Sequence, residues 1–137
     1  MATSGRGERA DVNVQFDAAV WEQEVERLGS GSPMHAAAVA ARRAIERDRG
    51  AAEWLRCDAE GGGGVRLPRC VKTYVPLGRE PSAAPYGFVF ELVAEKEPQP
   101  ALGVRLLAFG ERHPERPGTR SVYERAHRRL HGRYPDK

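Results

Sequence analysis

Three strand-like runs follow one another in the second half of the chain, and this succession constrains the fold more than any other feature. The runs extend from Val65 to Val75, from Tyr86 to Ala94 and from Gly103 to Phe109. Pro68 interrupts the first, and turns rich in Pro or Gly bound the other two. Apolar runs separated by such turns are typical of consecutive strands, and an antiparallel meander is their simplest arrangement. We therefore expect a small antiparallel sheet.

A further strand and a helix are predicted near the N-terminus. Apolar and polar residues alternate from Val12 to Phe16, as in a half-buried strand. Helical spacing follows from Ala18 to Leu28, with Asp17 placed to act as N-cap and Gly29 to end the helix. The apolar face of this helix consists of Trp21, Val25 and Leu28.

A second helix is predicted after a short turn. Ser32 and Pro33 have the residue types of an N-cap and a first helical position, and the helical pattern ends near Gly50. Its apolar stripe consists of Met34, Ala37, Ala38, Ala41 and Ile45. The tight turn predicts that the two helices run antiparallel.

Two segments between the helices and the strands carry weaker signals. Residues from Ala51 to Asp58 fit either an extension of the helix or a strand, and propensity does not decide between them. The four glycines from Gly61 to Gly64 indicate a hairpin or a linker. They lack the Lys and Ser or Thr, and the spacing, of a phosphate-binding loop.

The last predicted element is a helix from Ser121 to Gly132, in which Val122, Ala126 and Leu130 form an apolar stripe. The element order is therefore β-α-α-β-β-β-α, which indicates an α+β fold with the helix pair on one face of the sheet. The other face is then left for function or for a partner. We expect one domain over residues 12–137, preceded by a disordered tail at residues 1–11.

Several classes of protein are disfavoured. No apolar stretch approaches the length of a membrane-spanning helix, and the polar N-terminus does not resemble a secretion signal, so a cytoplasmic location is expected. Cys57 and Cys70 do not have the spacing of a zinc site and are interpreted as reduced structural thiols. The scattered acidic residues predict no metal site, and no small-molecule cofactor is implied.

Positive charge is concentrated at the C-terminal end. The chain has a net charge of +3, and from Val104 to Lys137 nine basic residues face four acidic ones. Such asymmetry favours a polyanion or an acidic protein as partner, although a solvated basic surface produces the same pattern.

The C-terminal half resembles the RelE/ParE superfamily of bacterial toxins. The run Leu107-Ala108-Phe109-Gly110-Glu111-Arg112-His113, followed by Ser121-Val122-Tyr123-Glu124-Arg125-Ala126-His127-Arg128-Arg129-Leu130, is similar to the RelE ending. In that ending a hydrophobic strand closes in Gly-basic-Arg and leads to a Val-Tyr helix. Arg69 to Tyr74 resembles the basic middle strand of the family, and Tyr86 to Leu92 resembles the strand that follows. The likeness extends from about Arg66 to Leu130.

The resemblance implies a ribosome-dependent endoribonuclease that cleaves mRNA by attack of a ribose 2′-hydroxyl. It gives the functional positions to Lys72, Arg112 and Tyr123. Arg112 and Lys72 are expected to stabilise the phosphate, and Tyr123 to stack on an unpaired base or to orient the phosphate. The resemblance also implies an acidic antitoxin protein that covers the sheet and displaces the last helix.

Further residues are assigned from their chemistry. Histidine titrates near neutral pH, so His113 is a candidate general acid or base, and His127 a weaker one. The basic residues expected to bind nucleic acid are Arg69, Arg105, Arg125, Arg128 and Arg129.

Two departures from the family pattern keep other interpretations open. The chain has Gly87 where the family has an Arg, and Tyr74 where it has a second Lys. These positions favour a ParE-like inhibitor of DNA gyrase, or a basic interaction module without activity. Arg112 and Tyr123 favour the nuclease.

Overall fold

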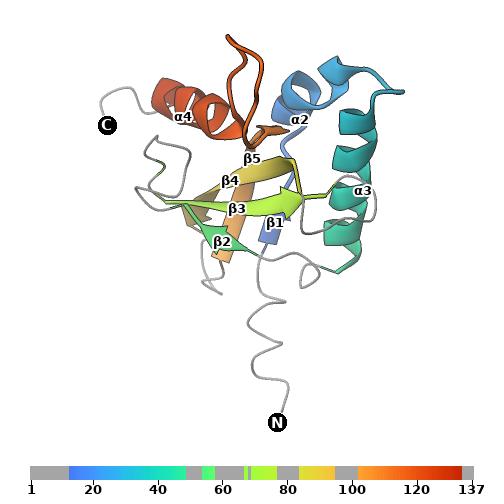
Figure 1. Ribbon diagram of the computed structural model, residues 1–137. Helices are drawn as coiled ribbons and strands as arrows, with labels where there is room; N and C mark the ends of the chain where they lie inside the picture. Colours follow the sequence, from blue (N-terminus) through green and yellow to red (C-terminus); the bar gives the residue numbers. More distant parts are fainter. Residues whose placement is uncertain are drawn as a thin grey trace.

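One mixed sheet with helices on both faces organises the part of the chain that the computed structural model describes, residues 13–48, 54–57, 67, 69–76, 84–94 and 102–133 (Figure 1). The strands lie in the order β1-β5-β4-β3-β2. Their bounds are Asn13–Gln15 for β1, Leu55–Arg56 for β2, Cys70–Val75 for β3, Tyr86–Ala94 for β4 and Leu102–Glu111 for β5. The predicted α+β class is therefore confirmed.

The sheet differs from the predicted one at both edges. The three central strands pair antiparallel as expected, but β1 runs parallel to β5, with Val14 opposite Val104. Two parallel strands need a long connection between them. Helices α2 and α3 and the other three strands lie between β1 and β5 in the sequence, so this requirement is met. The undecided segment contributes the short edge strand β2, with Leu55 opposite Lys72. The expectation of a purely antiparallel sheet was wrong.

Both N-terminal helices begin at their predicted caps. Helix α2 (Ala18–Glu24) starts where the Val20 N–H donates to Asp17 Oδ1 at 3.1 Å, and α3 (Pro33–Arg47) starts where the His35 N–H donates to Ser32 Oγ at 3.0 Å. Helix α2 is shorter than predicted. Its last turn tightens into the 3-10 helix η1 (Glu26–Leu28), as helix ends often do.

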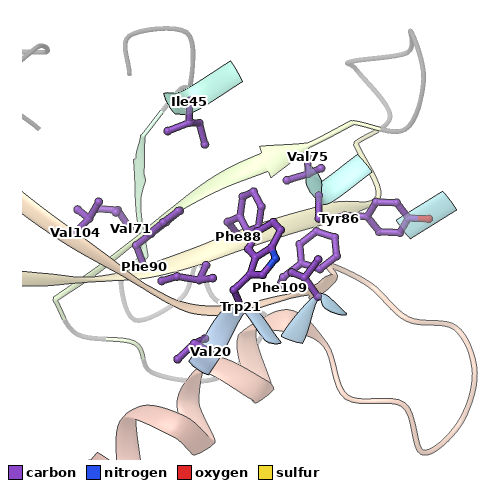
Figure 2. Close-up of a cluster of buried hydrophobic side chains, with 13 residues drawn as sticks. Val20, Trp21, Ile45, Val71, Val75, Tyr86, Phe88, Phe90, Val104 and Phe109 are labelled. Atoms are coloured by element: carbon purple, nitrogen blue, oxygen red, sulfur yellow. The ribbon is translucent and has the colours of Figure 1, made fainter. Parts of the chain in front are cut away.

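Helices α2 and α3 cover one face of the sheet, as predicted (Figure 1). Figure 2 shows Trp21 beside Phe88 in the core between the helix pair and the sheet. The rings of Phe88, Phe90 and Phe109 are completely buried there. The rings of Phe88 and Phe109 are in contact at a centroid distance of 5.1 Å and are tilted by 48° to each other. This aromatic core holds the helix pair against the middle of the sheet.

The opposite face is covered as well, which corrects the expectation that it is free. Helix α4 (Val122–Arg133) packs there through Val122 and Ala126 against Val89, Leu107 and Ala108. The predicted apolar stripe of this helix is thus used inside the molecule.

Some expectations lie outside the described residues, among them the tail at residues 1–11 and the run of four glycines. Within the described ranges, no helix has the length and the apolar composition needed to cross a bilayer.

Candidate nucleic-acid interface

Two cations and two aromatic rings gather at one end of the sheet, on the side of α4. Lys72 and Tyr74 belong to β3, Arg112 follows β5 directly, and Tyr123 lies in the first turn of α4. We call these four residues the cation–aromatic cluster. Three segments that are distant in sequence therefore supply one site.

Strand alternation places the two β3 members on the same face. Val71 and Val75 point into the core with α2 and α3, so Lys72 and Tyr74 between them point toward α4. Tyr74 lies opposite Gly87 on β4, and Gly87 lies opposite Gly110 on β5. Tyr74 therefore has Gly87 beside it on β4, and Gly110 lies one strand further on β5.

Arg112 is held on several sides. Its Nε donates to the Tyr123 hydroxyl at 3.3 Å, and its Nη1 donates to the Ala84 carbonyl at 2.9 Å. The guanidinium carbon lies 3.9 Å from the centre of the Tyr74 ring, a short cation–π contact. The backbone N–H of Arg112 donates to the Pro85 carbonyl at 2.8 Å. The side chain is half-buried and has a fixed direction.

Lys72 lies beneath this arrangement and is only 9% exposed. Its Nζ is 5.2 Å from the centre of the Tyr123 ring and 5.6 Å from that of Tyr74. Both rings thus contact a lysine, and Tyr74 contacts Arg112 as well. The resulting positive charge suits a phosphate, which Arg binds through its planar fork and Lys as a point charge.

Tyr123 is buried, with 2% of its surface exposed. The predicted stacking of its ring on a base is therefore wrong for this structure, because packing beneath α4 leaves no free face. Its hydroxyl instead accepts the hydrogen bond from Arg112. A capping box fixes the helix turn that carries it, since the Glu124 N–H donates to Ser121 Oγ and the Ser121 N–H donates to Glu124 Oε1. In this structure Tyr123 therefore contacts Arg112 through its hydroxyl and offers no open ring face.

His113 directly follows Arg112 and is exposed. No hydrogen bond joins its ring to the four members of the cluster. His127 and His131 stack on each other at 6.0 Å on α4, so His127 lies on that helix, outside the cluster.

The five predicted nucleic-acid-binding arginines fall into two groups. Arg69 and Arg128 are exposed. The other three hold internal carboxylates: Arg105 pairs with Glu91, and Arg125 and Arg129 pair with Glu24. A cation with an internal partner offers less charge to a ligand, so we leave Arg105, Arg125 and Arg129 out of the proposed RNA contact.

Glu24 is a key residue that the sequence analysis missed. It lies on α2, is 2% exposed, and accepts Arg125 Nε at 2.8 Å and Arg129 Nη2 at 2.8 Å. Glu24 Oε1 also accepts a hydrogen bond from the Phe109 N–H at 3.2 Å. Phe109 lies in the part of β5 that does not pair with β1. Burial raises the pKa of Glu24, but these partners, Arg125 foremost, lower it by more, so the pKa lies below its ordinary value. Helical spacing was the signal that could have found Glu24, because it lies three residues after Trp21 and four before Leu28, on the apolar face of the helix, whereas Glu22 does not.

The two cysteines are both buried and face each other across β2 and β3, where the Cys57 N–H donates to the Cys70 carbonyl at 3.0 Å. Burial raises the pKa of the Cys70 thiol to about 12. Such a thiol is a poor nucleophile. Among the residues that the structure describes, no three His, Cys, Asp or Glu side chains gather as metal ligands.

Comparison with protein-family models, with curated proteins and with solved structures finds no match in any of the three. The likeness to the RelE/ParE superfamily therefore rests on the sequence motifs quoted above.

Proposed function

We propose that this protein is a RelE-like toxin, a metal-independent endoribonuclease that cleaves mRNA on the ribosome. The observation that carries the proposal is the convergence of Lys72, Arg112 and Tyr123. The sequence motifs single out these three residues, which lie on separate elements, and they contact one another or a shared ring. Positioned groups of this kind are what phosphoryl chemistry requires.

In the proposed reaction the 2′-oxygen of a ribose attacks the adjacent phosphorus. A bond forms between that oxygen and phosphorus, and the bond from phosphorus to the 5′-oxygen of the next nucleotide breaks. The products are a 2′,3′-cyclic phosphate and a free 5′-hydroxyl. Arg112 and Lys72 stabilise the negative charge that builds on the phosphate oxygens, and Tyr123 holds Arg112 in place.

Proton transfer needs a further group, because the 2′-hydroxyl loses a proton and the leaving 5′-oxygen gains one. We assign the removal of the 2′-hydroxyl proton to His113 as general base, and solvent water donates the proton that the leaving 5′-oxygen gains. His113 is exposed and follows Arg112 in the chain.

A binding module of the same fold, ParE-like or inactive, is the second candidate. The burial of Tyr123 and the two hydrogen bonds that already occupy Arg112 favour it. A module of this kind binds an acidic or nucleic-acid partner through the same charges without cleaving it.

Induced expression in bacterial cells tests the proposal. The intact chain is expected to arrest growth and to create new 5′ ends in mRNA, and Arg112→Ala is expected to abolish both. Arg43→Ala is the matched control, because Arg43 is an exposed arginine on α3, which covers the other face of the sheet. Growth arrest without new mRNA ends favours the binding module. The absence of both growth arrest and new mRNA ends would reject the toxin assignment. For a toxin, an acidic antitoxin protein is the expected partner and the cytoplasm the expected location.

A further inference from the structure

We propose that Tyr74 and Arg112 bind an unpaired nucleobase of single-stranded RNA, with the Tyr74 ring as the stacking surface. The identification of the ligand as RNA rests on the proposed function. The base-binding role of Tyr74 rests on its exposure and on its contacts. In the sequence, Tyr74 stands out only as a departure from the family pattern.

Exposure separates Tyr74 from the other aromatic residues. It is 38% exposed and is the one large apolar side chain exposed among the described residues. The neighbouring rings of Tyr86 and Tyr123 are both buried. An aromatic ring that is open to solvent at a cationic site is a typical feature of proteins that bind single strands.

The two cations beside Tyr74 suit a nucleotide better than either charge alone. The Arg112 guanidinium stacks on the ring at 3.9 Å, and Lys72 Nζ lies 5.6 Å from its centre. A base stacked on the exposed part of the ring carries its own phosphate into reach of these charges. Aromatic stacking and phosphate neutralisation then act on the same nucleotide.

Gly87 leaves space for this arrangement. A Cβ at Gly87 would lie 3.5 Å from Arg112 Cγ and 3.8 Å from Arg112 Cδ, so the arginine side chain passes directly over the glycine. Gly87 is also the register partner of Tyr74. Arg112 therefore crosses β4 at Gly87 and reaches Tyr74 on β3. Gly87 and Tyr74, the two departures from the family pattern, therefore lie side by side and both contact Arg112.

An acidic peptide is the other polyanion that such charges attract. A carboxylate-rich peptide is bound through charge and has no flat ring system to stack on Tyr74. The exposed ring favours RNA, and the experiment below separates the two.

Fluorescence anisotropy with labelled hexanucleotides tests the proposal. The probe is 2′-O-methyl oligoadenylate, which has no free 2′-hydroxyl and cannot be cleaved by the proposed reaction. Its matched control has the same backbone and charge but abasic sites at the central positions. The wild-type full chain is expected to bind the intact probe about tenfold more tightly than the abasic one, the effect of stacking one base.

Variants of Tyr74 then identify the stacking residue. Tyr74→Ala and Tyr74→Lys are expected to lose the preference for the intact probe, and Tyr74→Trp to keep it. Thermal unfolding, which is expected to change little at this exposed position, checks that each variant is folded. A Tyr74→Ala protein that keeps the tenfold preference overturns the proposal. Equal binding of both probes by the wild type also overturns it, and leaves a charged site suited to an acidic peptide.

These outcomes are separable from those of the proposed function. A chain that cleaves mRNA in cells but shows no base preference at Tyr74 retains the function and loses this inference. A chain that cleaves nothing but binds the intact probe through Tyr74 retains the inference and loses the nuclease.

Discussion

Glu24 connects three parts of the molecule through one buried carboxylate. It lies on α2, it accepts a backbone hydrogen bond from β5, and it pairs with Arg125 and Arg129 of α4. An uncompensated charge in such a place is costly, so these partners depend on one another. The helix that carries Tyr123 is thereby fastened to the opposite side of the molecule.

Removing the charge of Glu24 is expected to destabilise the fold strongly. Glu24→Gln leaves two arginines without their carboxylate, and we expect a loss of about 3 kcal/mol in the free energy of unfolding. Urea denaturation measures it. Glu46→Gln is the matched control, because Glu46 forms an exposed pair with Arg42, and its loss is expected to cost no more than about 0.5 kcal/mol. Equal effects at the two positions would contradict the structural role of Glu24.

The stabilising effect of Glu24 is expected to depend on pH. Its pKa in the folded state lies below the ordinary value of 4.5, so below that pH the unfolded chain binds more protons than the folded one. The contribution is therefore complete above pH 4.5 and is lost as the pH falls through the lower folded pKa. Urea denaturation of the wild type and of Glu24→Gln, from above pH 4.5 into acid, is expected to show that the difference between their free energies of unfolding becomes smaller as the pH falls. A difference independent of pH would mean that the carboxylate charge is not responsible.

At the scale of the elements, the antiparallel register of β3, β4 and β5 decides what the site can be. It aligns Tyr74, Gly87 and Gly110 in one row across the sheet. Because the two glycines have no side chain, other groups can lie close to the backbone of the sheet at these positions. Helix α4 lies against Gly110, where a Cβ would be 3.7 Å from Val122, and Arg112 passes over Gly87.

Enlarging Gly87 is expected to break the contact between Arg112 and Tyr74. Gly87→Ala adds a Cβ at ordinary van der Waals distance from Arg112 Cγ and Thr73 O, 3.5 Å from each, and should be tolerated. Gly87→Val adds branches that extend into the path of Arg112. We expect the Val variant to bind the intact hexanucleotide several-fold more weakly and the Ala variant to bind it like the wild type. Unchanged binding by Gly87→Val, measured by anisotropy, would show that the crossing of Arg112 over β4 is unimportant.

At the scale of the whole molecule, the features that the sequence predicts are those with local causes. Asp17 and Ser32 cap their helices as predicted because a cap depends on residues three positions away. The strands β4 and β5 follow from apolar runs between turns. The α+β class follows from the order of these elements.

The features that the sequence does not predict depend on distant contacts. The parallel pairing of β1 with β5 has no signal in either strand, because alternation is the same for both directions. The pair between Glu24 and Arg125 joins residues 101 positions apart, so the basic face of α4 looked free in the sequence. Tyr123 was predicted to act with Arg112, either by stacking on a base or by orienting the phosphate. It does contact Arg112, but its burial, which the sequence does not predict, leaves only the second of these two roles open.

The most direct test of the account is cleavage by the purified chain on programmed bacterial ribosomes. The mRNA carries either a ribose or a 2′-deoxyribose at the mapped cleavage position. The account predicts cleavage of the ribose message into a 2′,3′-cyclic phosphate and a 5′-hydroxyl, none at the deoxy position, and none with Arg112→Ala. Cleavage of the deoxy message at the same position, or full activity of Arg112→Ala, would contradict it.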